Sequence, residues 1–489
     1  MPNYQTAGDL KSQLFARKVS ARELCDAAIA RIEALDPKIN AVVVRDFDRA
    51  RDAAAAADLA LARGNGARRS LLGIPMTVKE QFNIAGLATT WGYPKCRDWR
   101  PSTDALTIER LKAAGAVILG KTNVPISLAD WQSYNAIYGT TNNPWDLGRS
   151  PGGSSGGGAA ALATGYVPLE LGSDIGGSLR CPAHFCGVFS HKPSLDLVPG
   201  RGGGPPQTPA IPTRGDLAVI GPMARSAADL ALELDVLAGP DAWAEGVGYR
   251  LALPPPRHDR LADFRILVID EHPLCPTAAS VAGAVNDLAD RLGKLSCTVL
   301  RSSAAMPDLA HTTRLYVELL AAAFIGPDLP PEVRQRLASE AAALSADDDS
   351  LRACRLRGIL MPHNDWVIAT RTRFAITARW RALFRDIDAI LCPAMPTPAF
   401  PHDHSPIDER LLDVDGTAAR YADQVVWATI AILNGPPATT LPIARSPKGL
   451  PIGAQLIGAF LEDQTTIALA GRTERDLGCV FTPPPGYRE

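Results

Sequence analysis

The segment Gly152-Gly153-Ser154-Ser155-Gly156-Gly157-Gly158 places two adjacent serines among five glycines. A second segment, Gly172-Ser173-Asp174-Ile175-Gly176-Gly177-Ser178-Leu179-Arg180, places another serine 24 positions after Ser154. Glycine permits close backbone approach and unusual backbone angles. Glycine–serine tracts also occur in flexible linkers, but apolar residues at 159–163 and 167–171 flank these two segments. The pattern therefore favours two ordered turns within a packed fold over a linker.

A lysine, Lys79, ends an apolar, strand-like stretch at 71–78 and lies 75 positions before Ser154. A serine hydroxyl is a poor nucleophile unless a base removes its proton. Lysine normally carries a proton at pH 7, but burial against apolar strand residues lowers its pKa. Lys79, Ser154 and Ser178 thus supply a base, a relay hydroxyl and a nucleophile. This trio predicts amide-bond hydrolysis without histidine or metal.

Strand-like and helical patterns alternate along the rest of the chain, which predicts an α/β fold around a buried sheet. There is no internal repeat and no convincing linker, so we expect a single domain over 1–489. Within it, 1–65 is expected to be a helical N-terminal segment and 71–230 the catalytic core. The stretch Arg201-Gly202-Gly203-Gly204-Pro205-Pro206 predicts an irregular loop. Whether residues 200–215 form a lid stays open.

Composition excludes several classes of protein. The formal net charge is −2, so there is no electrostatic reason to expect a nucleic acid or an anionic membrane as partner. The longest apolar run, Val425 to Leu433, is too short to span a bilayer. The nine cysteines contain no CxxC pair, which argues against a disulfide framework or a zinc site. We therefore expect no metal, no cofactor and a reducing, cytoplasmic setting.

Two short motifs suggest other functions. Gly115-Ala116-Val117-Ile118-Leu119-Gly120-Lys121-Thr122 matches the GxxxxGK[ST] phosphate-binding loop. That loop needs a strand before its first glycine and a helix after its lysine, whereas here a helical pattern precedes Gly115 and the intervening residues are strand-like. A helix-ending glycine followed by a core strand is therefore the favoured interpretation.

Gly152-Gly153-Ser154-Ser155-Gly156 also matches GxSxG, the nucleophile elbow of α/β-hydrolases. An elbow follows a strand directly, but the preceding stretch, Thr141-Asn142-Asn143-Pro144-Trp145-Asp146, predicts a loop. The elbow also needs a downstream histidine base, and single histidines such as His191 and His363 are more often structural. This alternative is disfavoured.

Taken together, the two serine segments and Lys79 resemble the amidase signature family. The resemblance covers most of the chain and is densest from 73 to 187, with further family-like segments at 221–225, 388–398 and 435–469. The double-serine tract followed by Asp-Ile-Gly-Gly-Ser-Leu-Arg is its most specific part. The family implies one domain with a central mixed, twisted β-sheet covered on both faces by helices.

The resemblance implies a Ser–cis-Ser–Lys triad, with Ser178 as nucleophile, Ser154 as relay and Lys79 as base. The peptide bond before Ser154 would be cis. The oxyanion hole would come from backbone N–H groups of the loop Ile175, Gly176, Gly177 and Ser178. Around them, hydrogen bonds from two serines and one ion pair are expected to hold the site: Ser155, Ser173 and Asp174–Arg180.

The family fixes the type of bond better than the substrate. Aromatic residues near the motifs, Trp91, Trp131, Tyr134 and Tyr138, are candidates to line an apolar pocket, although each taken singly is more often a core residue. The stretch from about 300 to 386 resembles the family only weakly and is expected to shape this pocket. We expect a stand-alone amidase that acts on a small-molecule amide of small, aryl or anilide type, with carbamates and esters as extensions. A homodimer is left open.

Two competing functions remain. The first is the amidase-like A subunit of a glutamine-dependent tRNA amidotransferase, whose nucleophile loop usually reads Asp-Thr-Gly-Gly-Ser followed by Ile-Arg-Gln-Pro. This chain has Ile175 where threonine is usual and Cys181 where glutamine is usual, which lowers the expectation. The second is an inactive binding protein, and the intact triad positions argue against it.

Overall fold

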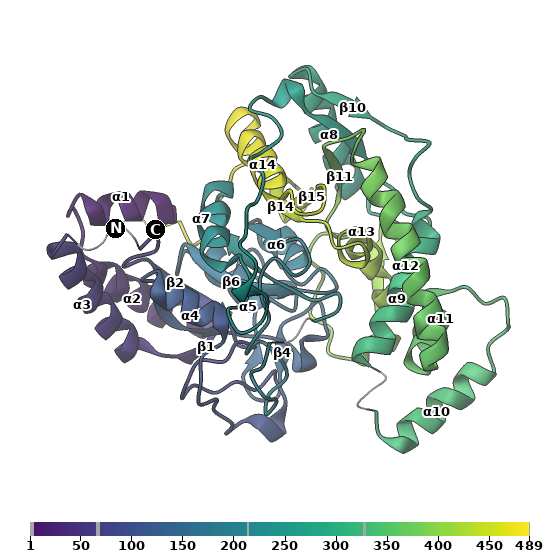
Figure 1. Ribbon diagram of the computed structural model, residues 1–489, viewed down its shortest axis with the longest axis horizontal. Helices are drawn as coiled ribbons and strands as arrows, with labels where there is room; N and C mark the ends of the chain where they lie inside the picture. Colours follow the sequence, from purple (N-terminus) through teal and green to yellow (C-terminus); the bar gives the residue numbers. More distant parts are fainter. Residues whose placement is uncertain (1–3, 65–68, 213–214, 326–328, 489) are drawn as a thin grey trace.

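The computed structural model describes the chain over residues 4–64, 69–212, 215–325 and 329–488. The predicted spans 200–215 and 300–386 each include a few residues that lie outside the described part of the chain. Only the other residues of these spans are described. Figure 1 shows one α/β domain in which α1–α3 lie at one end and α9–α12 at the other. Both termini lie together beside α1, where the Tyr4 hydroxyl donates to the carbonyl of Tyr487 at 2.5 Å.

The centre of the domain is an 11-stranded sheet in the order β1-β3-β2-β6-β8-β7-β14-β15-β11-β9-β10. The sheet is mixed, since β2 pairs in parallel with β3 and β6, whereas β6, β8, β7 and β14 pair antiparallel. The bounds of its strands are β1 Val42–Arg45, β2 Pro75–Lys79, β3 Val117–Thr122, β6 Leu169–Asp174, β7 Phe189–Lys192, β8 Val219–Ala224, β9 Arg265–Val268, β10 Thr298–Leu300, β11 Ala389–Pro393, β14 Ala438–Arg445 and β15 Pro451–Ile457.

Helices flank the sheet, and two small hairpins lie outside it. The hairpins are β4 Tyr134–Asn135 with β5 Gly139–Thr140, and β12 Leu411–Val414 with β13 Thr417–Arg420. The bounds of the helices are α1 Ala7–Phe15, α2 Ala21–Ile39, α3 Phe47–Ala62, α4 Leu106–Ala113, α5 Gly156–Ala163, α6 Arg180–Cys186, α7 Ala227–Leu237, α8 Ala279–Lys294, α9 Leu309–Phe324, α10 Pro331–Ala342, α11 Leu351–Ile359, α12 His363–Leu383, α13 Thr429–Leu433 and α14 Asp463–Leu477.

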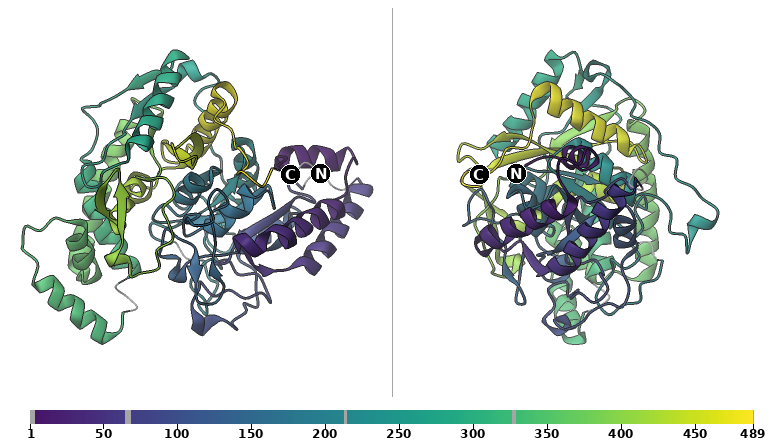
Figure 2. Two further views of the ribbon diagram at one scale, coloured as in Figure 1. Left: turned by 180° about the vertical axis from the view of Figure 1, so that it is seen from behind. Right: turned by 90° about the vertical axis from the view of Figure 1, so that its left-hand side faces the viewer.

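Strand β14 shows that helices cover both faces of the sheet. Successive side chains of a strand point to opposite faces, and Thr439 hydrogen-bonds Thr466 of α14 at 2.9 Å. The next residue, Thr440, lies on the other face beside Gly453, where a Cβ would come within 3.1 Å of the α6 backbone at His184. Helix α7 packs with α14, and α5 packs with α6. The expected sheet with helices on both faces is therefore confirmed, and Figure 2 shows these layers from two further directions.

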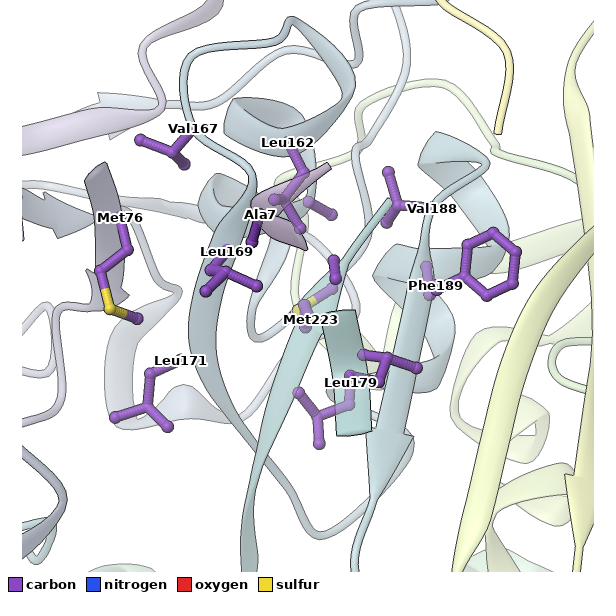
Figure 3. Packing of buried hydrophobic residues seen from close by; sticks show 14 of the residues in the cluster. Ala7, Met76, Leu162, Val167, Leu169, Leu171, Leu179, Val188, Phe189 and Met223 are labelled. Carbon is purple, nitrogen blue, oxygen red and sulfur yellow. The ribbon is translucent and has the colours of Figure 1, made fainter. Parts of the chain in front are cut away.

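The core beneath the two serine segments is dense and apolar. Met76 and Leu171 come from β2 and β6, and Leu179 precedes α6. These three side chains are fully buried in one continuous cluster, shown in Figure 3. Burial of this kind is the main favourable contribution to folding. It holds the ends of β2 and β6 in a fixed relation; β2 ends at Lys79, and the segment that carries Ser178 leaves the sheet at the end of β6.

Two sequence expectations need comment here. The prediction that 1–65 is helical omits β1, a short apolar strand that pairs antiparallel with β3; a run of four residues is too short for its periodicity to separate strand from helix. The rejection of a phosphate loop at 115–122 is confirmed, because Gly120, Lys121 and Thr122 belong to the buried strand β3. Their backbone groups take part in the sheet and do not face a ligand.

All nine cysteines are free and buried. Within the described ranges, no helix combines the length and the apolar character needed to cross a bilayer.

Candidate active site

Lys79 is the last residue of β2 and is completely buried. Burial disfavours the charged ammonium and lowers the pKa of Lys79 to about 7, although the carboxylates of Asp174 and Glu170 act in the opposite direction. Its Nζ lies 2.8 Å from Ser154 Oγ and 2.9 Å from Ser173 Oγ. The amine therefore titrates close to pH 7, and it is in direct contact with two hydroxyls.

Ser154 lies in the turn before α5, and the Gly153–Ser154 peptide bond is cis. Glycine is needed at 153 because a Cβ there would come within 2.3 Å of the carbonyl oxygen of Asp130. The backbone of 130–132 thus packs directly on this turn. The arrangement directs the Ser154 hydroxyl toward Lys79, as the sequence resemblance implies.

Ser178 lies between β6 and α6 and is 5% exposed. The N–H of Ser155 donates to the Ser178 carbonyl at 3.2 Å, which joins the two glycine-rich segments. The Ser155 hydroxyl donates to the Ser173 carbonyl at 3.3 Å. Ser173 also donates to the side-chain oxygen of Gln81. Ser155 and Ser173 therefore lie between the elements that carry Lys79 and Ser178.

The buried carboxylate of Asp174 organises the loop that carries Ser178. It pairs with Arg180 at 2.8 Å and accepts hydrogen bonds from the N–H groups of Gly177 at 2.9 Å and Leu179 at 3.0 Å. Burial alone would raise the pKa of Asp174, but the Arg180 charge and these donors outweigh it and lower the pKa to about 2. The expected ion pair is present, and it fixes the loop from inside.

One of the four amides expected to form an oxyanion hole is engaged elsewhere. The Gly177 N–H donates to the Asp174 carboxylate at 2.9 Å and is therefore already engaged in this structure. In the described part of the chain, the N–H groups of Ile175, Gly176 and Ser178 have no hydrogen-bond partner. They remain the candidate donors.

Two aromatic side chains hold the carbonyl groups of the same loop. The Tyr316 hydroxyl, from α9, donates to the Ile175 carbonyl at 2.5 Å. The Trp131 Nε1 donates to the Gly176 carbonyl at 2.8 Å. Since a carbonyl and the next N–H point to opposite sides of a peptide unit, fixing these carbonyls also directs the N–H groups of Gly176 and Gly177.

The predicted pocket residues fall into two groups. Trp131 touches the Ser178 loop directly, as just described. Tyr134 instead stacks on His404 at 3.9 Å between ring centroids and accepts a hydrogen bond from Arg410 at 2.8 Å. Tyr138 donates to Glu80 at 3.2 Å. Their hydroxyls serve neighbouring loops, so the structure gives no support to Tyr134 and Tyr138 as pocket residues.

Sequence reasoning did not find Tyr316 or Gln455. Gln455, on β15, accepts from Arg180 at 2.9 Å and donates to the carbonyls of Pro393 and Trp427. It thereby ties the Asp174–Arg180 pair to β11. Neither residue lies in a recognisable motif, and the only available signal was its place in a segment (300–386 or 435–469) that was already expected to matter.

No group of three or more histidine, cysteine, aspartate or glutamate side chains within the described ranges could hold a metal ion. The polar groups around Ser178 are instead hydroxyls, one amine, backbone amides and one ion pair. These groups can move a proton between hydroxyls and a neutral amine, and they can donate hydrogen bonds to a carbonyl oxygen.

A family model described as amidase matches residues 23–467. The chain belongs to the amidase signature family. Members of this family hydrolyse amide C–N bonds, and this chain is an amidase of that kind. The chain has the lysine and both serines of the family pattern. Lys79 contacts Ser154 directly, and the segment of Ser154 is hydrogen-bonded to that of Ser178.

Several known proteins are similar over nearly the whole length. The A subunit of the glutamyl-tRNA(Gln) amidotransferase of Anaeromyxobacter sp. (strain K) is 33% identical, and the alignment covers 96% of this chain and 95% of that protein. AtzE of Pseudomonas sp. (strain ADP), a 1-carboxybiuret hydrolase subunit, is 34% identical over 94% of this chain and 96% of that one. A solved, inhibitor-bound structure described as a vestigial protein complex that reveals the origins of an s-triazine catabolic enzyme is 30% identical, with a TM-score of 0.81 over 98% of this chain and 99% of the other.

Proposed function

We propose that this amidase hydrolyses small, aryl or anilide-type carboxamides through an acyl-enzyme on Ser178. The observation that carries the proposal is the 2.8 Å contact between the buried Lys79 Nζ and Ser154 Oγ. A buried amine whose pKa is lowered to about 7 is unprotonated in a substantial fraction of molecules at neutral pH, and this neutral form can accept a proton. Ser154 then relays the proton from Ser178 to Lys79.

The proposed reaction has two halves. Ser178 Oγ attacks the amide carbonyl carbon while its proton passes to Ser154 and the proton of Ser154 passes to Lys79. The C–N bond then breaks, the departing nitrogen takes a proton back through Ser154, and the amine leaves. Water repeats the same steps on the ester of Ser178 and releases the carboxylate.

The oxyanion that forms in each half needs donors that are already in place. We assign this role to the N–H groups of Ile175, Gly176 and Ser178. Rigid support favours the assignment, since Trp131 and Tyr316 hold the loop from outside and Asp174 holds it from inside. Fixed donors need no reorganisation as charge develops.

The proposed preference for neutral acyl or aryl groups rests on the side chains next to the nucleophile loop. Trp131 and Ile175 pack against the apolar cluster that contains Tyr316 and Trp427. The two nearby arginines are already engaged, Arg180 with Asp174 and Arg410 with Asp130. An apolar ring suits these surroundings better than a charged group does. Carbamates and esters present the same carbonyl to the same donors.

The relatives whose names describe them as subunits support a second candidate, the A subunit of a glutamine-dependent tRNA amidotransferase. That protein would act in a complex and pass ammonia to a partner. Ile175 and Cys181 depart from the usual loop of such a protein, so we place it second.

The decisive experiment uses the purified chain alone with a chromogenic anilide. We expect turnover by the wild type that a metal chelator does not change, and a loss of at least about 10⁴-fold in Ser178→Ala. Mass spectrometry of a slow ester substrate should find the acyl group on Ser178 in the wild type only. Turnover that appears only with glutamine and added partner proteins would favour the second candidate, and full activity in Ser178→Ala would refute the mechanism.

A further inference from the structure

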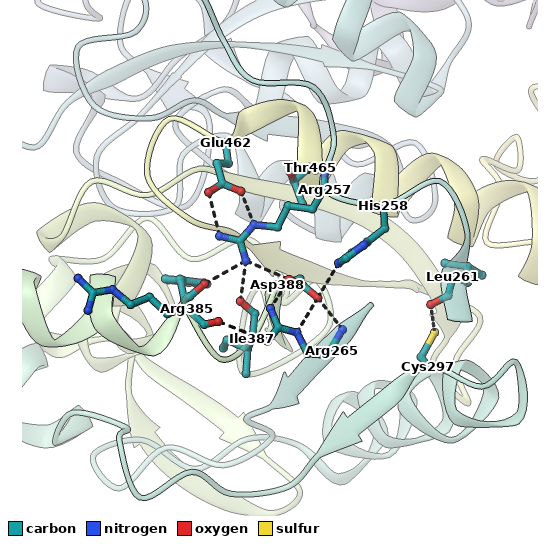
Figure 4. A network of polar contacts seen from close by, with 11 residues as sticks. Arg257, His258, Leu261, Arg265, Cys297, Arg385, Ile387, Asp388, Glu462 and Thr465 are labelled. Atoms are coloured by element: carbon teal, nitrogen blue, oxygen red, sulfur yellow. Dashed lines mark hydrogen bonds and ion pairs between the residues drawn. The ribbon is translucent and has the colours of Figure 1, made fainter. Parts of the chain in front are cut away.

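A cavity of about 610 Å³ opens where β9 and β11 begin, on the side of α12 and α14. Figure 4 shows the polar network around it. Strand β11 runs from Ala389, beside this cavity, to Pro393, whose carbonyl binds Gln455 of the active-site network. The cavity therefore lies at the far end of β11 from Ser178. Its principal lining residues are Arg257, Arg265, Arg381, Arg385, Asp388 and Phe460.

Two of the four arginines form the rigid floor of the cavity. Arg257 donates to Glu462 at 2.8 Å, to Asp388 at 2.9 Å and to the carbonyl of Ile387 at 2.9 Å. Arg265 donates to both oxygens of Asp388, at 2.8 and 3.2 Å. Asp388 is fully buried. These contacts fix the chain that follows α12. They also provide the carboxylates of Asp388 and Glu462 with arginine partners.

The other two arginines are held differently. Arg381 and Arg385 are one turn apart on and just after α12, and both are exposed. Neither forms an ion pair with a carboxylate of the described residues. The Arg381 guanidinium lies over the ring of Phe460, 4.4 Å from its centroid. Both residues belong to the lining of the cavity.

The charges around the cavity do not balance. Four guanidiniums face two carboxylates, those of Asp388 and Glu462, so the lining carries a net charge of +2 before His258 is considered. Guanidinium groups bind planar oxyanions through paired hydrogen bonds. A phosphate group carries a charge of about −1.5 to −2 at pH 7, whereas a single carboxylate carries −1. The dianion matches the excess charge.

We propose that this cavity is a binding site for a phosphate group, either as inorganic phosphate or as a phosphate monoester. Arg381 and Arg385 supply the free donors, and Arg257 and Arg265 supply a fixed positive floor. Phe460 holds Arg381 over the opening and offers an apolar edge for the organic part of an ester. The site is separate from the hydrolytic centre and does not depend on the proposed amide substrate.

Isothermal titration calorimetry of the full-length wild type with inorganic phosphate, phenyl phosphate and acetate, at one ionic strength, tests the site. We expect saturable binding of phosphate and phenyl phosphate, and none of acetate over the same range. The Arg381→Ala and Arg385→Ala variants should each weaken phosphate binding about tenfold, because each loses charge-assisted hydrogen bonds. Tighter binding of phenyl phosphate than of phosphate would identify an ester as the occupant, and the reverse order would identify the free ion.

Arg379→Ala is the matched control, since Arg379 is exposed on the same helix but does not line the cavity. It should keep the wild-type dissociation constant. The proposal is overturned if the wild type shows no saturable phosphate binding, if acetate binds as tightly as phosphate, or if Arg379→Ala weakens binding as much as Arg381→Ala does. Thermal unfolding of all three variants identifies any loss of fold, and phosphate should raise the unfolding temperature of the wild type and of Arg379→Ala more than that of Arg381→Ala and Arg385→Ala.

Discussion

Lys79 and Lys121 lie on neighbouring parallel strands, and both are completely buried. Lys121 pairs in register with Val78, so Lys79 and Lys121 project from opposite faces of the sheet. Lys79 reaches the hydroxyls of Ser154 and Ser173. Lys121 donates instead to the Ala88 carbonyl at 2.5 Å and the Thr89 hydroxyl at 2.7 Å.

Burial has the same electrostatic effect on both amines. It lowers the pKa of Lys79 to about 7 against the opposing effect of Asp174 and Glu170, and that of Lys121 to about 8 against the opposing effect of Glu80. A lowered pKa therefore does not by itself make a lysine a base in the reaction. What distinguishes Lys79 is its contact with the Ser154 hydroxyl, which the proposed mechanism uses as the relay to Ser178.

The largest expected effect separates the two lysines by activity. Lys79→Met should lower kcat/KM by about 10² to 10⁴-fold, the usual contribution of a general base. Lys121→Met, which removes an equally buried amine from the adjacent strand, should leave kcat/KM near the wild-type value. The measurement is steady-state hydrolysis of one anilide by both variants after their folding has been checked by thermal unfolding. Equal losses would mean that the contrast between the two faces is wrong.

The pH dependence of the rate should follow Lys79 alone. The base must be unprotonated, so kcat/KM should fall as the pH drops through about 7, by about tenfold for each pH unit below it, and reach a plateau above it. Lys121→Met should show the same midpoint. A profile that is flat from about pH 6 to 10 would exclude a lysine base. A shifted midpoint in Lys121→Met would show that the titration of Lys79 depends on Lys121.

The sequence was sufficient to propose the reacting residues and the Asp174–Arg180 pair beside them, but not the contacts that reach the Ser178 loop from distant segments. Lys79, Ser154 and Ser178 lie in motifs whose spacing identifies them, and the α/β class follows from alternating elements. The bond from Tyr316 to the Ile175 carbonyl joins residues 141 positions apart, and no local pattern records such a contact. The engagement of the Gly177 amide is equally invisible, because it depends on where Asp174 turns. For Tyr134 and Tyr138 closeness in sequence to a motif was the only signal, and it does not decide where a side chain points.

Tyr316→Phe tests that support with a smaller expected effect. Loss of one hydrogen bond, worth about 1 kcal/mol, should lower kcat about fivefold and leave KM and the pH midpoint unchanged, because the loop moves while Lys79 does not. Tyr93→Phe is the matched control, as it removes an exposed tyrosine–serine hydrogen bond, to Ser127 at 2.7 Å. If both variants kept the wild-type kcat, Tyr316 would have no role in positioning the loop.

The last expected effect concerns stability and not activity. The folded-state pKa of Lys121 is about 8, below its ordinary value of 10.5, so between these pH values the unfolded chain holds a proton that the folded chain has lost. The free energy of unfolding of the wild type should therefore rise with pH over this window relative to Lys121→Met, by at most about 1.4 kcal/mol per pH unit. Urea denaturation at pH 7, 8, 9 and 10 measures the difference between the two proteins. If the free energy of unfolding of the two proteins changed with pH in parallel, Lys121 would keep its proton when buried. Burial alone would then not account for a neutral Lys79. Its hydroxyl partners Ser154 and Ser173 would have to explain why it is neutral.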